Sequence, residues 1–202
     1  GRLNWAFLRG IGYTESALRQ ETCAWYGEVG VWGHYYADRI DGGNSGLFPH
    51  TAIYDRLMAG IDLALGYGGF SFTSAFTYGQ FDGSDLAAVP HFSDEEWMIW
   101  LVQAGYLFPG SAWEIAGRWS AYDRTIKTAA ADLNPTTNEF ALGINYYLNG
   151  HANKMTLDAA YISATADGVA GGGYYDMYPG MPLGFNSDGE SFLIRFQWQL
   201  AL

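Results

Sequence analysis

Charged and polar side chains recur at every second position in stretches that are otherwise apolar. Lys154, Thr156 and Asp158 alternate with apolar neighbours, and Arg195 and Gln197 do the same near the end of the chain. Successive side chains of an extended strand point to opposite faces, so this spacing gathers the polar groups on one face. Charged groups that border a water-filled passage set which ions pass. The pattern therefore favours selection of ions or solutes over bond-making chemistry.

Signatures of an enzyme are absent from the sequence. It contains no Gly-x-Ser-x-Gly elbow, P-loop, dinucleotide-binding glycine fingerprint or His-Glu-x-x-His helix. His91, Ser93 and Asp94 lie together in one expected loop, and such close neighbours do not converge as base, nucleophile and orienting group. The acidic stretches 38–41 and 82–96 lack the spacing of an EF-hand calcium loop, so solvated loop charge is the favoured interpretation. We expect no catalytic residue, no metal and no cofactor.

Composition narrows the class of protein further. The net charge of −11 argues against nucleic acid as a partner, because phosphate binding needs a basic face. The single Cys23 excludes an internal disulfide, and no apolar run reaches the roughly 20 residues of a membrane helix. Charged residues make up 15% of the chain against a usual value of about 25%, while aromatic residues reach 17%. Many aromatic residues in short alternating segments are typical of membrane barrels with aromatic belts.

Apolar alternation predicts nine strands in one domain that covers residues 1–202. The strands are expected at 2–13, 21–37, 52–67, 69–82, 95–107, 111–124, 137–148, 153–166 and 190–202. The Asn149-Gly150 pair between two alternating runs is the strongest hairpin signal. Most of these segments exceed the 5–6 residues of a soluble strand and match the roughly 9–11 residues of a tilted membrane strand. The faces of the first strand cannot be assigned, because Arg9 falls on the same face as the apolar Trp5 and Phe7.

The expected connections alternate between short and long. Short turns are expected at 66–69, 108–111 and 148–153, and long loops at 38–51, 83–94, 125–136 and 167–189. Outer-membrane barrels have short turns on the periplasmic side and long loops on the outside. The chain therefore has the connection pattern of an outer-membrane barrel.

The residues at the polar alternate positions of each strand are expected to line the interior of this barrel. They are Glu28, Trp32, His34, Asp62, Glu114, Arg118, Glu139, Asn145, Lys154, Asp158, Arg195 and Gln197. The acidic members outnumber the basic ones, so this wall is expected to lean acidic. Opposed charges across the passage either tune permeation or only neutralise one another and stiffen the wall, and both interpretations stay open. Six of the other seven tryptophans are expected in a lipid-facing belt rather than in a sugar-stacking platform: Trp25, Trp97, Trp100, Trp113, Trp119 and Trp198.

Two segments resemble a known family. NEFALGINYYLNGHANKMTLDAAY at 138–161 and the terminal SFLIRFQWQLAL look like the C-terminal part of the phosphate-selective porin O/P type, and the resemblance covers 95–202. It implies a barrel of about 16 strands, usually trimeric, of which this chain is the C-terminal half. The expected acidic lining departs from the family, so phosphate selectivity is not carried over. The chain also ends in Leu202, where many outer-membrane proteins end in Phe.

We therefore expect an all-β, antiparallel transmembrane barrel in an outer membrane, which lets small hydrophilic solutes or ions diffuse passively. The expected partners are lipid, lipopolysaccharide at the outer rim and further copies of the chain in a trimer. Three alternatives remain: a structural or anchoring barrel without an open pore, half of a two-chain split barrel, and an enzyme barrel.

Overall fold

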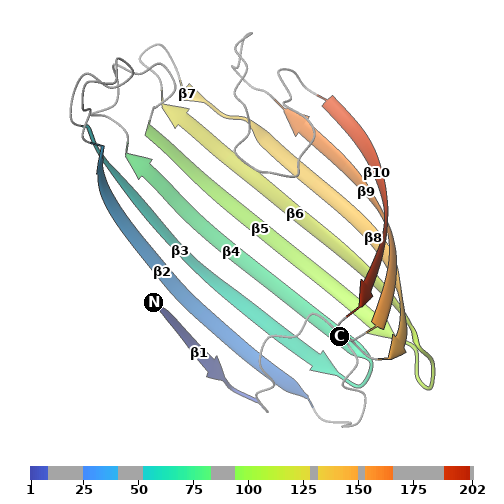
Figure 1. The fold of residues 1–202 in the computed structure, drawn as a ribbon. Coiled ribbons are helices and arrows are strands. Elements are labelled where there is room, and N and C mark those ends of the chain that lie inside the picture. Colours follow the sequence, from blue (N-terminus) through green and yellow to red (C-terminus); the bar gives the residue numbers. More distant parts are fainter. Residues whose placement is uncertain are drawn as a thin grey trace.

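The computed structural model describes residues 1–8, 25–40, 52–82, 94–127, 132–149, 153–165 and 189–200. These residues form one antiparallel sheet of ten strands, which confirms the all-β antiparallel prediction (Figure 1). The strands are β1 (Arg2–Ala6), β2 (Tyr26–Ile40), β3 (Ala52–Tyr67), β4 (Phe70–Asp82), β5 (Asp94–Leu107), β6 (Trp113–Lys127), β7 (Asp132–Leu133), β8 (Thr136–Asn149), β9 (Asn153–Thr165) and β10 (Gly189–Leu200). No helix in these segments is long and apolar enough to cross a membrane.

Each long strand pairs with its neighbour in sequence, so the sheet is a simple meander from β1 to β10. Apart from the two-residue β7, nine strands remain, and they correspond to the nine predicted ones. The two-residue β7 was not predicted and pairs only with β6, where Lys127 lies opposite Asp132. The predicted loop 125–136 was therefore wrong at its ends, because β6 continues to Lys127 and β8 begins at Thr136.

The first strand is shorter than predicted. β1 ends at Ala6, and Phe7 and Leu8 follow it outside the strand, although the Leu8 amide still donates to the Gly27 carbonyl at 3.3 Å. The expected strand at 2–13 was thus too long, in the region where the alternation of Trp5, Phe7 and Arg9 fails; residues 9–13 lie outside the described segments.

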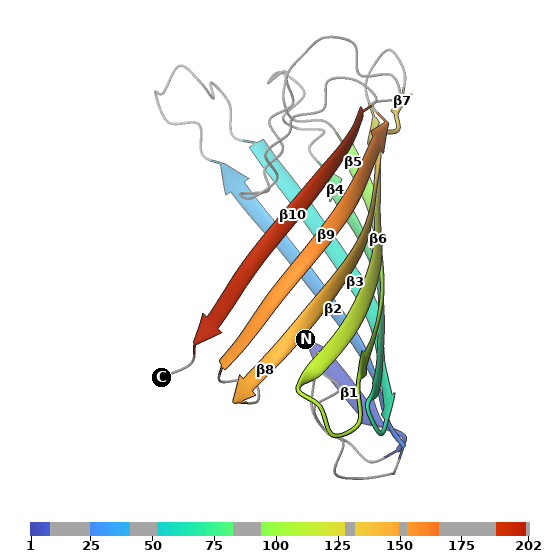
Figure 2. The same ribbon diagram turned by 90° about the vertical axis from the view of Figure 1, so that its right-hand side faces the viewer.

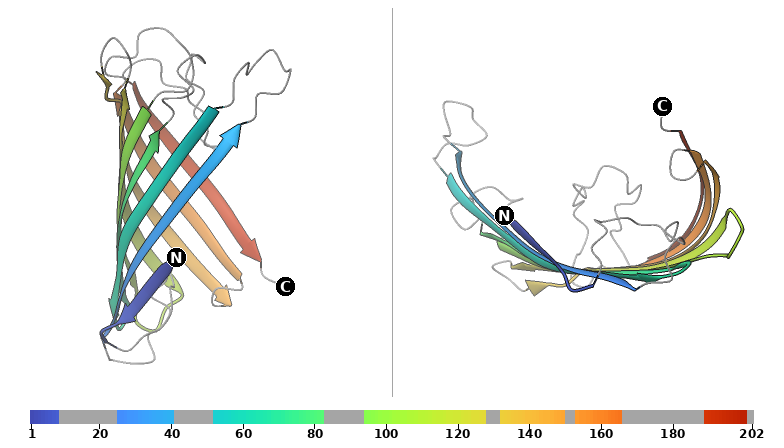
Figure 3. Two further views of the ribbon diagram at one scale, coloured as in Figure 1. Left: turned by 90° about the vertical axis from the view of Figure 1, so that its left-hand side faces the viewer. Right: turned by 90° about the horizontal axis from the view of Figure 1, so that it is seen from below.

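The sheet is open and strongly curved. β1 and β10 lie at its two edges, and seen from below the sheet forms an arc (Figure 3). Figure 2 shows β8, β9 and β10 running obliquely to the long axis of the molecule. The described residues therefore form a curved wall and do not close into a barrel.

Antiparallel order sends alternate connections to opposite edges. The connections β2–β3, β4–β5, β6–β8 and β9–β10 leave from one edge, which we call the loop edge. The connections β3–β4, β5–β6 and β8–β9 lie at the other, which we call the turn edge. Gly68 and Gly110, with φ of 56° and 68°, allow the backbone to reverse in two of these turns. Gly150 of the predicted Asn-Gly turn lies outside the described residues.

Candidate pore wall on the concave face

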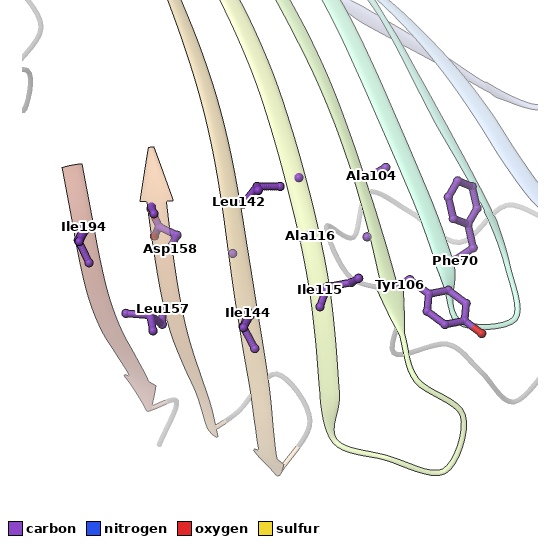
Figure 4. A pocket seen from close by; sticks show the side chains of 14 residues that line it. Phe70, Ala104, Tyr106, Ile115, Ala116, Leu142, Ile144, Leu157, Asp158 and Ile194 are labelled. Atoms are coloured by element: carbon purple, nitrogen blue, oxygen red, sulfur yellow. The ribbon is translucent and has the colours of Figure 1, made fainter. Parts of the chain in front are cut away.

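The convex side of the sheet, which we call the outer face, is apolar. Figure 4 views the sheet from the side opposite to Figure 1, and this side is lined by large apolar residues such as Leu142, Ile144 and Ile115 together with small ones such as Ala104. Leu142 is 76% exposed and Phe196 is 67% exposed. Such exposure of large apolar side chains is the opposite of what a sheet folded over a water-free core shows.

The apolar outer face forms a band of nearly constant width. It covers alternate residues from Leu57 to Tyr67 on β3, from Met98 to Tyr106 on β5 and from Phe192 to Leu200 on β10. Within these spans the outer face carries no charged side chain. The strand lengths in the band, about 9–11 residues, are those of a tilted strand that crosses hydrocarbon.

The concave side, which we call the inner face, holds all twelve predicted lining residues. Cross-strand partners lie on the same face of a sheet. Arg195 lies opposite Asp158, Asp158 opposite Gly143, and the same chain of partners runs through Gly105 on β5 to Tyr26 on β2. The predicted parity is thus correct on every strand concerned, and the lining of a pore stays a prediction.

Charges on the inner face are paired between neighbouring strands. Arg195 contacts Asp158 at 2.8 Å, Arg124 contacts Glu95 at 2.6 Å, and Arg118 pairs with Glu139. Acid and base thus lie side by side on one wall in the predicted pairs Arg195–Asp158 and Arg118–Glu139, which fits the interpretation that such charges neutralise one another; Arg124–Glu95 was not predicted. Each guanidinium has its carboxylate on the next strand, because their registers place the two side chains close together.

The Arg2–Asp62 ion pair joins two strands that are not neighbours. Arg2 on β1 reaches Asp62 on β3 at 2.8 Å, across β2. Gly30 lies between them on β2, and a Cβ atom there would contact both the guanidinium and the carboxylate. The missing side chain therefore lets one ion pair tie the edge strand to the third strand.

The inner face is balanced in charge. Its described side chains include six bases and six acids: Arg2, Arg56, Arg118, Arg124, Lys154 and Arg195 against Glu28, Asp62, Glu95, Glu114, Glu139 and Asp158. Among these described side chains the predicted acidic excess is absent, because the prediction omitted Arg2, Arg56, Arg124 and Glu95. The sequence could have placed Arg56 and Arg124 on the inner face, because they lie an even number of residues from Asp62 and Arg118 on the same strands. It could not have placed Arg2, because the faces of the first strand were not assigned.

Glu114 is withdrawn from the surface of the inner face. Glu114 is only 1% exposed. Its carboxylate accepts hydrogen bonds from the Tyr147 hydroxyl and from Asn145 Nδ2, the latter at 3.0 Å. The Thr156 hydroxyl donates to Asn145 Oδ1 at 2.6 Å, and Gly105 leaves room for the carboxylate. Both donors come from β8 and meet the same oxygen, Oε2, so these hydrogen bonds tie β6 to β8 and compensate part of the cost of burying the carboxylate. The prediction that Glu114 lines an open passage is therefore corrected to a structural role.

Aromatic rings cover glycines on the inner face. Trp32 lies over its cross-strand partner Gly60, and Trp97 lies over its partner Gly79. The guanidinium of Arg56 covers the Trp97 ring at 5.2 Å. Trp97, which is 6% exposed, was therefore wrongly predicted to face lipid. An aromatic ring across from glycine fills the space that the missing side chain leaves.

The other five tryptophans that were predicted to face lipid lie on or beside the outer face. Trp25 precedes β2 and stacks on Tyr67, with ring centroids 5.0 Å apart. Four more lie on the outer face: Trp100, Trp113, Trp119 and Trp198. Neither tryptophan of the inner face forms an open sugar-stacking platform, since Trp97 is buried and the Trp32 ring is used over glycine.

The remaining predicted residues of the inner face are neither clustered nor suited to metal binding. His34 stacks on Tyr36 at 6.5 Å, and the Lys154 ammonium lies 6.0 Å from the centre of the Tyr147 ring. Within the described segments, no three histidine, cysteine or acidic residues come together in a way that could hold a metal ion.

The ion pairs lead to a prediction about charge in the wall. If this face borders a water-filled passage, as the sequence predicts, Arg195→Gln leaves Asp158 without its partner and is expected to shift permeation towards cations, whereas Asp158→Asn together with Arg195→Gln restores neutrality and the original preference. The stability of either variant should change by no more than about 1 kcal/mol, because the pair is partly exposed. Reversal potentials in a salt gradient measure the effect; equal values for the single and double variants would contradict it.

Comparisons with protein-family models, curated proteins and solved structures give no match to this chain.

Proposed function

We propose that this chain forms part of the wall of an outer-membrane porin, through which small hydrophilic solutes or ions diffuse passively. The observation that carries the proposal is the sorting of side chains between the two faces. Large apolar residues stand exposed on the convex face, while paired charges and amides occupy the concave face. A curved sheet of this kind fits a place between lipid outside and water inside.

The extent of the apolar band supports contact with hydrocarbon. Soluble monomers rarely expose an apolar patch larger than a few hundred Å². Here the exposed apolar side chains run from Leu57 on β3 to Phe196 on β10. Membrane barrels carry an outward apolar band about 25 Å tall, flanked by aromatic residues. Tyr67, Tyr106 and Trp113 near the turn edge suit one such flank, with the loop edge towards the outside and its lipopolysaccharide.

Closure of the barrel needs further strands. β1 and β10 both run towards the turn edge, as the meander of nine long strands requires. A direct seam between them, within one copy or between two copies, would be parallel. An odd number of additional strands gives antiparallel seams throughout and the even total of bacterial barrels. A barrel of about 16 strands, which the resemblance to the phosphate-selective porin O/P type implies, meets this condition, and a second polypeptide is the alternative source of the missing wall.

A structural barrel without an open pore is the second candidate. A barrel of about eight strands has an interior just wide enough for side chains. The wide arc in Figure 3 and the charged inner face fit a larger, wet interior better. The open pore is therefore the preferred form of the proposal.

Conductance separates these functions. Protein purified from native outer membranes is expected to give discrete current steps in a planar lipid bilayer, and heat-denatured protein is expected to give none. A protein that fractionates with the outer membrane and runs as a heat-modifiable band, yet gives no current steps, would support the structural barrel instead. Recovery in the soluble fraction would contradict both.

A further inference from the structure

A groove crosses the apolar outer face from β4 to β10 and ends beside the turn edge (Figure 4). Its volume is about 720 Å³, and fourteen residues line it. Three small residues of the outer face leave the space open: Ala104 on β5, Gly117 on β6 and Ala159 on β9. Gly105 and Gly143 border the same space, so its floor reaches the backbone of the sheet. Larger side chains enclose it, among them Phe70, Tyr106, Ile115, Ile144, Leu157 and Ile194.

The lining of the groove suits hydrocarbon and no other chemistry. Nearly all its atoms are apolar, and its one charged residue, Asp158, is paired with Arg195 on the inner face. A polar or charged ligand would lose its contacts with water there and gain none in return. If the groove were empty, the side chains around it would lose dispersion contacts on one side. An alkyl chain restores those contacts.

A second copy of the chain is a poor occupant of the groove. The groove lies on the convex side of the sheet, and two convex walls touch without entering each other's hollows (Figure 3). A standard protein interface also uses about 20–30 residues on each side. Fourteen residues line the groove, which is too few for such an interface. A flexible alkyl chain needs no matching surface and follows the groove as it is.

Polar groups at the turn end of the groove suit the ester and phosphate oxygens of a lipid. The Tyr106 hydroxyl lies at this end (Figure 4), and Trp113 and Tyr146 stand on the outer face beside the turn edge, with ring centroids 4.5 Å apart. In the described part of the chain, these two hydroxyls and the Trp113 indole N–H have no hydrogen-bond partner. Tyrosine and tryptophan side chains favour the headgroup level of a membrane, where their polar ends meet lipid oxygens.

We propose that this groove binds an acyl chain of a phospholipid in the periplasmic leaflet, with Tyr106 at the level of its ester groups. The inference rests on the proposed porin function, which places the outer face in lipid and the turn edge on the periplasmic side. Lipopolysaccharide occupies the opposite leaflet, at the loop edge. Recognition of the chain is assigned to Ala104, Gly117 and Ala159, because larger side chains at these positions would fill the groove.

The test fills the groove and follows a phosphatidylethanolamine that carries a photoreactive diazirine in its acyl chain. The groove variant is Ala104→Leu with Ala159→Leu. The matched control is Ala37→Leu with Ala59→Leu, two exposed alanines of the outer face that lie outside the groove. Each protein is inserted into phosphatidylethanolamine vesicles that contain the probe and irradiated, and labelled residues are located by mass spectrometry. Heat-modifiable migration on gels checks folding, and Ala104→Leu alone provides a milder substitution.

In the wild-type protein and the control, labelling around the groove on β5, β6 and β9 is expected to exceed that on the outer face of β3 several-fold. The groove variant is expected to lose most of this excess, and Ala104→Leu alone to lose part of it. Even labelling of the wild-type outer face, an unchanged excess in the folded groove variant, or displacement of the probe by lipopolysaccharide would overturn this inference and leave the porin function standing. Absence of labelling anywhere on the outer face of folded wild-type protein would overturn its placement in lipid, and with it the porin function.

Discussion

Phe196→Arg is expected to destabilise the membrane-inserted protein by about 2–4 kcal/mol, because a guanidinium at the middle of a lipid-facing band must leave water. Phe196 lies midway along the outer face of β10 and is 67% exposed. In a soluble sheet an exposed Phe→Arg change would cost little, since surface substitutions usually stay within about 0.5 kcal/mol. Refolding into lipid vesicles, followed by denaturant titration, measures the difference.

Gln197→Arg is the matched control for this substitution. Gln197 is the next residue on β10, lies at nearly the same depth and is exposed on the inner face. Arginine is expected to be tolerated there, because the side chain meets water in the proposed pore. Equal stability of the two variants would mean that the outer face is not in lipid.

Gly79→Val is expected to destabilise the wall by about 1–3 kcal/mol, the usual cost of forcing extra side-chain volume into a packed site. A Cβ atom at Gly79 would overlap the indole of Trp97, which lies over this glycine and is itself covered by the Arg56 guanidinium. The loss should appear in the same titration as a lower midpoint. The expected effect requires Trp97 to be unable to move aside.

Two further variants test this explanation. Trp97→Ala combined with Gly79→Val is expected to be less destabilised than the sum of the single changes, because the overlap disappears. Gly33→Val is the matched glycine control, since a Cβ atom there meets only the Met58 carbonyl oxygen at 3.9 Å. A Gly33→Val loss as large as that of Gly79→Val would show that strand glycine itself, and not the indole contact, sets the cost.

Much of this architecture is predictable from alternation alone. The run from Phe192 to Leu200 and the polar parity of Lys154 and Asp158 identify strand and face without any knowledge of neighbours. The period of two is a local property, and a slip of one residue would turn the apolar set to the other face. For this reason the twelve predicted inner-face residues share one face although their contacts were not foreseen.

Contacts between strands depend on register, which alternation does not reveal. The pairing of Arg118 with Glu139 and the burial of Glu114 beneath Tyr147 follow from how β6 and β8 are aligned. Trp97 was misplaced for a related reason. An indole fits the inner face only because Gly79 is its cross-strand partner, and that partnership is set by the β4–β5 register.

Accessibility along β10 tests the central claim, that one face of this wall meets lipid and the other meets water, most directly. Single cysteines at successive positions from Phe192 to Gln199, in a Cys23→Ser background, carry spin labels in the protein inserted into vesicles. Labels at 192, 194, 196 and 198 are expected to be relaxed mainly by oxygen, which concentrates in lipid. Labels at 193, 195, 197 and 199 are expected to be relaxed mainly by a water-soluble nickel chelate. Equal access of the nickel chelate to both sets would contradict a wall between lipid and water.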